Sequence, residues 1–137
     1  MQSDFQLFIE AHSDAYRRAT TELRQGHKST HWMWFIFPQL AGLGRSEMSK
    51  IFALTSLDEA REYAVHPILG SRLLECVDLL QDLPTANATA IFGKVDAMKL
   101  HSCLTLFALA CPDRPIFKAA IDRWFKGEMD TATLSLV

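Results

Sequence analysis

The chain has 137 residues, of which 49% are hydrophobic and 22% are charged, and its formal net charge is -2 at pH 7. This length fits a single domain with its own hydrophobic core, and the composition is that of a globular protein. The slight negative charge argues against binding to a nucleic-acid polymer, which needs many lysines and arginines, but allows a small anionic ligand.

The sequence also lacks the patterns that are typical of membrane-spanning and of secreted proteins. No apolar run reaches the roughly 20 residues of a membrane span, and the first residues carry no basic segment typical of a secretory signal. The three cysteines, Cys76, Cys103 and Cys111, are odd in number and lack metal-ligand spacing. We therefore expect a cytoplasmic protein with reduced, buried thiols, no cofactor and no membrane contact, and its oligomeric state stays open.

The first predicted helix spans residues 3–25. Ser3 is expected to cap it, apolar residues recur along it at helical spacing, and Gly26 is a natural residue to end it. Residues 27–40, HKSTHWMWFIFPQL, are predicted as an irregular aromatic segment. Its HWMWFIF portion is the only stretch with strand-like composition, and one strand cannot make a sheet.

The rest of the chain is predicted as successive helices separated by capping residues and prolines. Asp96 is expected to cap the most apolar of them, and Asp130 a terminal turn. The expected helices are residues 46–54, 56–66, 67–80, 96–111 and 115–125, with a short helical turn before Gly93. We therefore predict one all-α domain over residues 1–137, with about six to seven helices.

Several long stretches of the sequence together resemble a known family. They are GHKSTHWMWFIFPQ, HPILGSRL, IFGKVDAMKLHSCLTLF and FKGEMDTATLSLV, and they extend over nearly the whole chain. The sequence is similar to the bacterial domain-of-unknown-function family 1810, whose pattern includes G-x-K-x-x-H-W-M-W and F-G-x-x-D-x-x-K-x-x-S. The resemblance implies a small, mainly helical protein and brings no settled activity with it.

A second, much weaker resemblance concerns the NADAR proteins. Those are helical N-glycosidases that act on ADP-ribosyl or ribosylated nucleobase substrates. The resemblance implies cleavage of an N-glycosidic bond as a reaction to test. The residues that carry it are Ser56, Glu59 and Ala60, then Arg72 and Leu73, and then Gly93 and Asp96.

Lys28 and His31 are candidate catalytic residues in the aromatic segment. A lysine among aromatic side chains can lose solvation and act as a nucleophile or bind an anion, and a nearby histidine can transfer protons. In the structural alternative, Lys28 is a solvated residue after a helix end and His31 hydrogen-bonds to the backbone. His27 and His31 have i, i+4 spacing, but no third ligand accompanies them, so no metal site is expected.

Trp34 and Gln39 are candidate substrate-binding residues of the same segment. Most of its aromatic side chains are expected in the core, with Trp34 as the wall of a pocket. In an extended segment His31 and Trp34 would point to opposite faces. A site that they share therefore requires a turn or a helical step between them, in which i and i+3 neighbours meet.

Asp96, Lys99 and Ser102 form a polar stripe on an otherwise apolar helix, at i, i+3 and i+6. A cleft in front of this stripe would offer one polar ligand a carboxylate, an ammonium and a hydroxyl group. We take Asp96 as a candidate catalytic residue, and Lys99 and Ser102 as candidates for substrate binding. In the structural alternative, Asp96 caps the helix and pairs with Lys99 on the surface.

Arg72 is the last candidate for substrate binding. It lies beside the apolar face of its predicted helix, where it is either an ion-pair partner for Asp96 or Glu22 or a clamp for phosphate or carboxylate. His66, next to Pro67, is expected to cap a helix start.

The leading hypothesis is a pocket between the aromatic segment and the helix that begins near Asp96. It would hold a small anionic or ribose-bearing molecule and hydrolyse it or cleave a glycosidic bond. The alternative is a non-catalytic module that binds a ligand or a protein and whose polar network is structural. In the first hypothesis the ligand is held by Lys28, Arg72 and Lys99, and Trp34 stacks on it. The general acid and base are then His31 and either Asp96 or Glu22.

Overall fold

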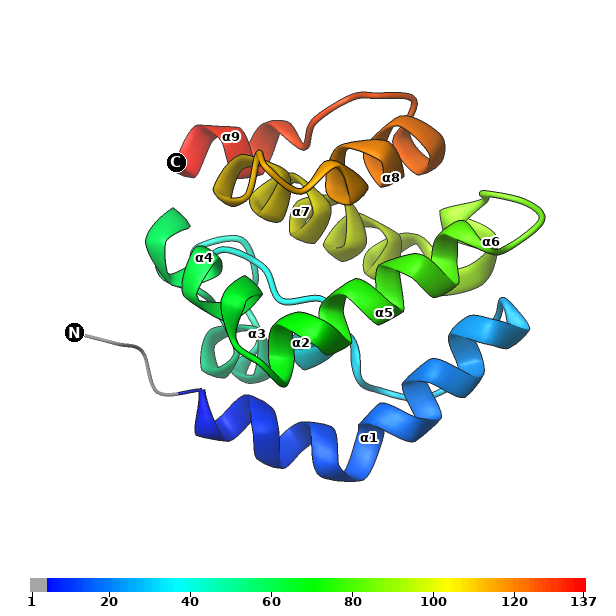
Figure 1. Ribbon diagram of the computed structural model, residues 1–137, viewed down its shortest axis with the longest axis horizontal. Coiled ribbons are helices and arrows are strands. Elements are labelled where there is room, and N and C mark those ends of the chain that lie inside the picture. Colours follow the sequence, from blue (N-terminus) through cyan, green and yellow to red (C-terminus); the bar gives the residue numbers. More distant parts are fainter. Residues whose placement is uncertain (1–4) are drawn as a thin grey trace.

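The computed structural model describes residues 5–137 and shows an all-α fold, as predicted (Figure 1). Ser3, the expected first cap, lies outside the described residues. Five helices have seven residues or more: α1 (Gln6–Gln25), α4 (Leu57–Val65), α5 (Leu69–Gln81), α7 (Lys94–Ala110) and α8 (Pro115–Phe125). The shorter helices within residues 5–137 are α2 (Met33–Ile36), α3 (Glu47–Ile51), α6 (Ala88–Phe92) and α9 (Thr131–Leu136).

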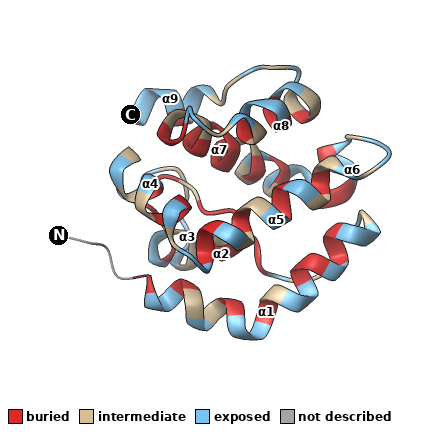
Figure 2. Cartoon of the chain, in the orientation of Figure 1, coloured by how far each residue is buried: buried red, intermediate tan, exposed pale blue. Residues whose placement is uncertain are grey.

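The centre of the fold is α7. It packs against α4, α6, α8 and α9, while α1 packs against α5 on the other side of the molecule (Figure 1). Nearly all sides of α7 are apolar, which is typical of a helix surrounded by others. Figure 2 shows the result as a run of buried residues along α7 and along the inner faces of α1 and α5.

Local capping signals explain several helix boundaries. Gly26 ends α1 in the left-handed conformation with φ 74°, and Pro115 stands in the first turn of α8. The side chains of Ser46, Ser56 and Asp130 accept a hydrogen bond from the backbone N–H three residues on, so these three predicted caps are confirmed.

The prediction that Asp96 caps α7 is wrong. The helix begins at Lys94, directly after Gly93, so Asp96 lies inside the first turn. Gly93 has φ 81°, which lets the chain turn from α6 directly into α7 without a capping side chain. Freed from capping, the Asp96 carboxylate pairs with lysine side chains instead.

The aromatic segment turns out to contain a single helical turn, α2, which the sequence did not predict. Trp32 and Phe37, on either side of α2, are fully buried, and so are Met33 and Ile36 within it. The segment then runs to Leu40, which pairs with Leu54 in an isolated parallel bridge; residues 5–137 contain no longer strand. The aromatic side chains are thus mostly core, as expected.

Two further expectations concern membrane spans and cysteines. Among the helices that the structure describes, none is long and apolar enough to cross a membrane. All three cysteines are free and buried, and burial raises the pKa of the Cys76 thiol to about 12 and that of Cys103 well above its usual value. The three thiols are therefore unreactive core residues in the folded protein.

Candidate functional site

Glu22, near the end of α1, organises the segment that follows the helix. Its carboxylate accepts hydrogen bonds from the backbone N–H groups of Ser29 and Thr30, at 2.6 and 3.0 Å. It also accepts from the Thr30 hydroxyl at 2.6 Å and from the Trp32 indole N–H at 3.0 Å. Burial alone would raise the pKa of Glu22, but these hydrogen bonds outweigh it and lower the pKa from 4.5 to about 2. Glu22 is therefore ionised at neutral pH and has a structural role, which argues against its use as an acid–base group.

Lys28, Asp96 and Lys99 form a chain of alternating charges, which we call the lysine–aspartate network. The Lys28 ammonium lies 2.9 Å from Oδ2 of Asp96 and donates to the Thr30 carbonyl at 2.6 Å. The Lys99 ammonium lies 3.5 Å from Oδ1 of the same carboxylate. Because charge-assisted hydrogen bonds are usually 2.7–2.9 Å long, Lys28 is held tightly and Lys99 only loosely.

Two tryptophans lie beside this network. The Lys28 ammonium is 5.1 Å from the ring of Trp32, and the Lys99 ammonium is 5.0 Å from the ring of Trp34. The ring of His31, an exposed residue, lies 6.5 Å from the Trp34 ring. The chain turns into α2 between His31 and Trp34, so that both side chains lie on the same side. A site shared by these two residues requires such a turn. The indole N–H of Trp34 is buried and has no hydrogen-bond partner within the described residues.

A cleft opens next to Lys99, between α7 and the loop that follows the aromatic segment. We call it the α7 cleft, and its volume is about 420 Å³. Three of the predicted site residues, Gln39, Lys99 and Ser102, line it. The other lining residues are Leu43, Gly44, Arg45, Ser46 and Ser49 of the loop and α3, Val95 and Met98 of α7, and Asp130 and Ala132 at the start of α9.

Ser102 contributes to the cleft wall through a hydroxyl that is already engaged. Its Oγ donates to Oδ2 of Asp130 at 3.0 Å and contacts the Met98 carbonyl at 3.1 Å. Oδ2 of Asp130 also accepts from the backbone N–H and the hydroxyl of Thr133, at 3.1 and 2.6 Å. Ser102 thus ties the capping residue of α9 to α7, and its geometry supports a structural role.

Arg72 lies apart from the other candidates. Its guanidinium group stacks over the ring of Tyr16, 4.7 Å from the centroid, where α5 packs against α1. Within residues 5–137 it forms no ion pair with Asp96 or Glu22, so the suggested pairings are wrong. His66 has the expected capping role, because its Nδ1 accepts from the backbone N–H groups of Ile68 and Leu69 at 3.1 and 3.2 Å.

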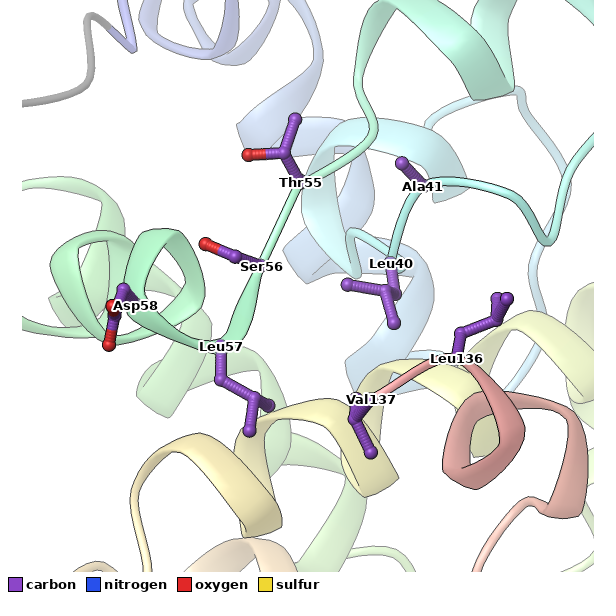
Figure 3. A pocket seen from close by; sticks show the side chains of 8 residues that line it. All are labelled: Leu40, Ala41, Thr55, Ser56, Leu57, Asp58, Leu136 and Val137. Carbon is purple, nitrogen blue, oxygen red and sulfur yellow. The ribbon is translucent and has the colours of Figure 1, made fainter.

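A second cleft, also of about 420 Å³, lies at the end of α9 and contains none of the candidate catalytic or substrate-binding residues. Figure 3 shows its lining, in which Leu40, Leu57, Leu136 and Val137 supply the apolar part. Of its polar residues, Ser56 caps α4 and Asp58 pairs with Arg61 at 3.3 Å. Because its only charged side chain is acidic and paired, it offers an anionic ligand no cation, and the α7 cleft is the better candidate.

Comparison with known proteins places the chain in a family. Residues 2–137 match the family described as "Protein of unknown function (DUF1810)". The chain belongs to the DUF1810 family. A solved structure similar to this DUF1810 protein is that of the conserved hypothetical protein Rv1873 from Mycobacterium tuberculosis. The two sequences are 40% identical, the match covers 98% of this chain and 96% of that one, and the TM-score is 0.95. No curated protein matches the chain.

Sequence reasoning missed four polar residues of the α7 cleft: Arg45, Ser46, Ser49 and Asp130. Arg45 lies in the loop before α3, where no sequence motif marks it, and the sequence predicts Asp130 only as a cap. Gly44 packs so closely against Ser49 that an added Cβ would collide with it, which keeps the loop against α3 and shapes this wall. Within the described residues, no group of three or more His, Cys, Asp or Glu side chains could hold a metal ion.

Proposed function

We propose that the α7 cleft of this DUF1810 protein binds a small anionic molecule. The observation that carries the proposal is the position of Lys99, which lines the cleft but is only loosely paired inside the protein. Lys28 already pairs with Asp96 at 2.9 Å, whereas Lys99 is 3.5 Å away. An anion in the cleft can therefore attract Lys99 without leaving the Asp96 carboxylate unpaired.

The other cleft residues support the same ligand class. Arg45 is exposed and forms no ion pair in the part of the chain that the structure describes. Together with Lys99 it outweighs the single carboxylate of Asp130, so the cleft carries a net positive charge. A guanidinium group can bind phosphate or carboxylate with two hydrogen bonds, and the amide of Gln39 can donate a further one.

The size and the apolar part of the cleft favour an organic anion over a bare inorganic ion. A volume of about 420 Å³ lies within the range of small-molecule sites. The side chains of Val95 and Met98 are 65% and 64% exposed at its edge, where they offer apolar contact.

Cleavage of an N-glycosidic bond, with Asp96 and His31 as acid–base groups, is the catalytic version of this proposal. Both Asp96 oxygens pair with lysines, and Asp96 is not among the residues that line the cleft. The geometry therefore supports binding without catalysis better than it supports hydrolysis. Incubation with ADP-ribosylated guanosine and related N-ribosides tests the reaction. Release of base by the wild type but not by Asp96→Asn would establish a glycosidase, and no release from the whole panel would eliminate one.

We also propose a cytoplasmic location and no binding to nucleic-acid polymers. Free, buried thiols are typical of a reducing compartment. The net charge of -2 supports a small anion as ligand in preference to a polymer.

Binding can be tested by calorimetric titration with inorganic phosphate and phosphate esters at low and high salt. At low salt, where screening is weak, Lys99→Gln should weaken binding about tenfold, because the contact between the Lys99 ammonium and the anion is lost. Lys118→Gln is the matched control: Lys118 pairs with Asp122 at 2.9 Å on the exposed face of α8 and does not line the cleft. Equal affinities of the two variants, or no binding of any anion by the wild type, would refute the proposal.

A second experiment separates the site from a purely structural network. Lys28→Gln should reduce stability by about 1–3 kcal/mol, because the Lys28 side chain is only 7% exposed and its loss leaves a partly buried carboxylate with a weaker partner. Lys99→Gln should change the free energy of unfolding by less than about 1 kcal/mol, as for other loosely held ion pairs. Large losses in both variants would indicate that the whole network is structural.

A further inference from the structure

Asp130 is the N-cap residue of α9 and also lines the α7 cleft. As the cap of α9, it uses only one of its carboxylate oxygens: Oδ2 accepts all three hydrogen bonds, from Thr133 N–H, the Thr133 hydroxyl and the Ser102 hydroxyl. Its backbone N–H donates to the Thr105 hydroxyl at 2.9 Å. The residue is therefore fixed from both its main chain and its side chain.

The second oxygen of this carboxylate is unused. Oδ1 of Asp130 has no hydrogen-bond partner within residues 5–137, and Asp130 pairs with no cation there. A carboxylate oxygen can accept about two hydrogen bonds. Asp130 is half-buried and lines the α7 cleft, as does Arg45. A rigid, unused acceptor thus borders a cleft whose other charged groups are cations.

We propose that the ligand of the α7 cleft is a sugar phosphate, free or as part of a nucleotide, whose hydroxyl groups donate to Oδ1 of Asp130. This inference rests on the proposed function, since it assigns the phosphate to Lys99 and Arg45. The acceptor requires a donor on the ligand, and a charged amine is disfavoured because the cleft is already net positive. Neutral vicinal hydroxyls next to a phosphate group satisfy both conditions.

Capping alone does not require a carboxylate at this position. Asparagine and serine cap helices about as well as aspartate, because one side-chain oxygen is enough. An Asp130→Asn variant therefore keeps the capping oxygen and replaces the unused acceptor by an N–H₂ donor. It removes the hydroxyl recognition without removing the cap.

The experiment compares three ligands on the wild type and on Asp130→Asn: inorganic phosphate, adenosine 5′-monophosphate and its 2′,3′-dideoxy analogue. The wild type should bind the nucleotide about tenfold more tightly than the dideoxy analogue, because a hydrogen bond to a charged acceptor is lost. Asp130→Asn should reduce this ratio to about one, because the acceptor for the ligand hydroxyls is then lost. Ribose 5-phosphate, as a fourth ligand, distinguishes recognition of the free sugar phosphate from recognition of the nucleotide.

The outcomes separate this inference from the function on which it rests. Phosphate binding that depends on Lys99, together with equal affinities for the two nucleotides, would overturn the sugar-phosphate assignment alone. Loss of all anion binding would overturn the proposed function itself. If Asp130→Asn loses its thermal unfolding transition, Asp130→Ser, which also keeps a capping oxygen, replaces it in the same comparison. A wild-type hydroxyl preference that survives in the folded variant refutes the role of Asp130.

Discussion

The buried carboxylate of Glu22 allows a quantitative prediction of acid sensitivity. Its pKa is about 2 in the folded protein and 4.5 without the fold. At about 1.36 kcal/mol per pH unit, this difference corresponds to about 3 kcal/mol of stability at neutral pH. Between pH 4.5 and about 2 the unfolded chain takes up a proton that the folded chain does not. The contribution is therefore complete above pH 4.5 and is lost as the pH falls through that range.

Glu22→Gln removes the charge and keeps the shape of the side chain. One oxygen that accepted hydrogen bonds becomes a donor facing other donors, so we expect a loss of about 2–3 kcal/mol at pH 7. The measurement is urea-induced unfolding followed by far-ultraviolet circular dichroism from pH 7 down to pH 2. The difference between wild type and variant should shrink steadily below pH 4.5, since the wild type then loses its advantage.

The matched control is Glu10→Gln, on an exposed residue of the same helix. It should differ from the wild type by no more than about 0.5 kcal/mol at any pH, as surface substitutions usually do. The reasoning would be refuted if Glu22→Gln behaved like this control at pH 7. It would equally be refuted by a difference between wild type and Glu22→Gln that stayed constant as the pH fell.

The remaining predictions concern the core. Gly70→Ala should lower stability by about 1–3 kcal/mol in thermal unfolding, because a Cβ there would collide with the Ala64 carbonyl, whereas the neighbouring exposed Ser71→Ala should not. Burial lowers the pKa of His12 from 6.5 to about 4, despite its hydrogen bond with a backbone carbonyl. Between these pH values the unfolded chain binds a proton at His12 that the folded protein does not, so the free energy of unfolding decreases as the pH falls. His12→Phe should lack this pH dependence in urea unfolding; an unchanged slope would contradict the assignment. The three cysteines should react with a thiol reagent only after unfolding, and rapid labelling of the native protein would disprove their inertness.

Capping signals were predictable from sequence because they act over three or four residues. Ser46, Ser56 and Asp130 cap the helices that follow them, and Pro115 begins α8 as expected. Asp96 failed as a cap for a reason outside this local rule. Gly93, with positive φ, takes the cap position three residues before Asp96, and no side-chain pattern indicates that conformation.

The cluster at the site was predictable in part, since its residues lie on two segments with recognisable polar spacing. Lys28 and Asp96 meet at 2.9 Å, and the Lys99 ammonium lies 5.0 Å from the Trp34 ring. Arg72 could not be placed, because the Tyr16 ring on which it stacks is brought near only by the packing of α1 on α5. The role of Glu22 was equally invisible, because its four donors come from a loop whose course depends on tertiary structure.

The short helix α9 forms part of the wall of both clefts. Asp130 and Ala132, at its start, border the α7 cleft, while Leu136 and Val137, at its end, border the second one. Leu136 also packs against Gly42, in the loop between the two. A substitution that loosens α9 therefore deforms two cavities at once. An affinity change after a mutation in the second cleft is not evidence of a ligand there unless the Asp130 cap is shown to be intact.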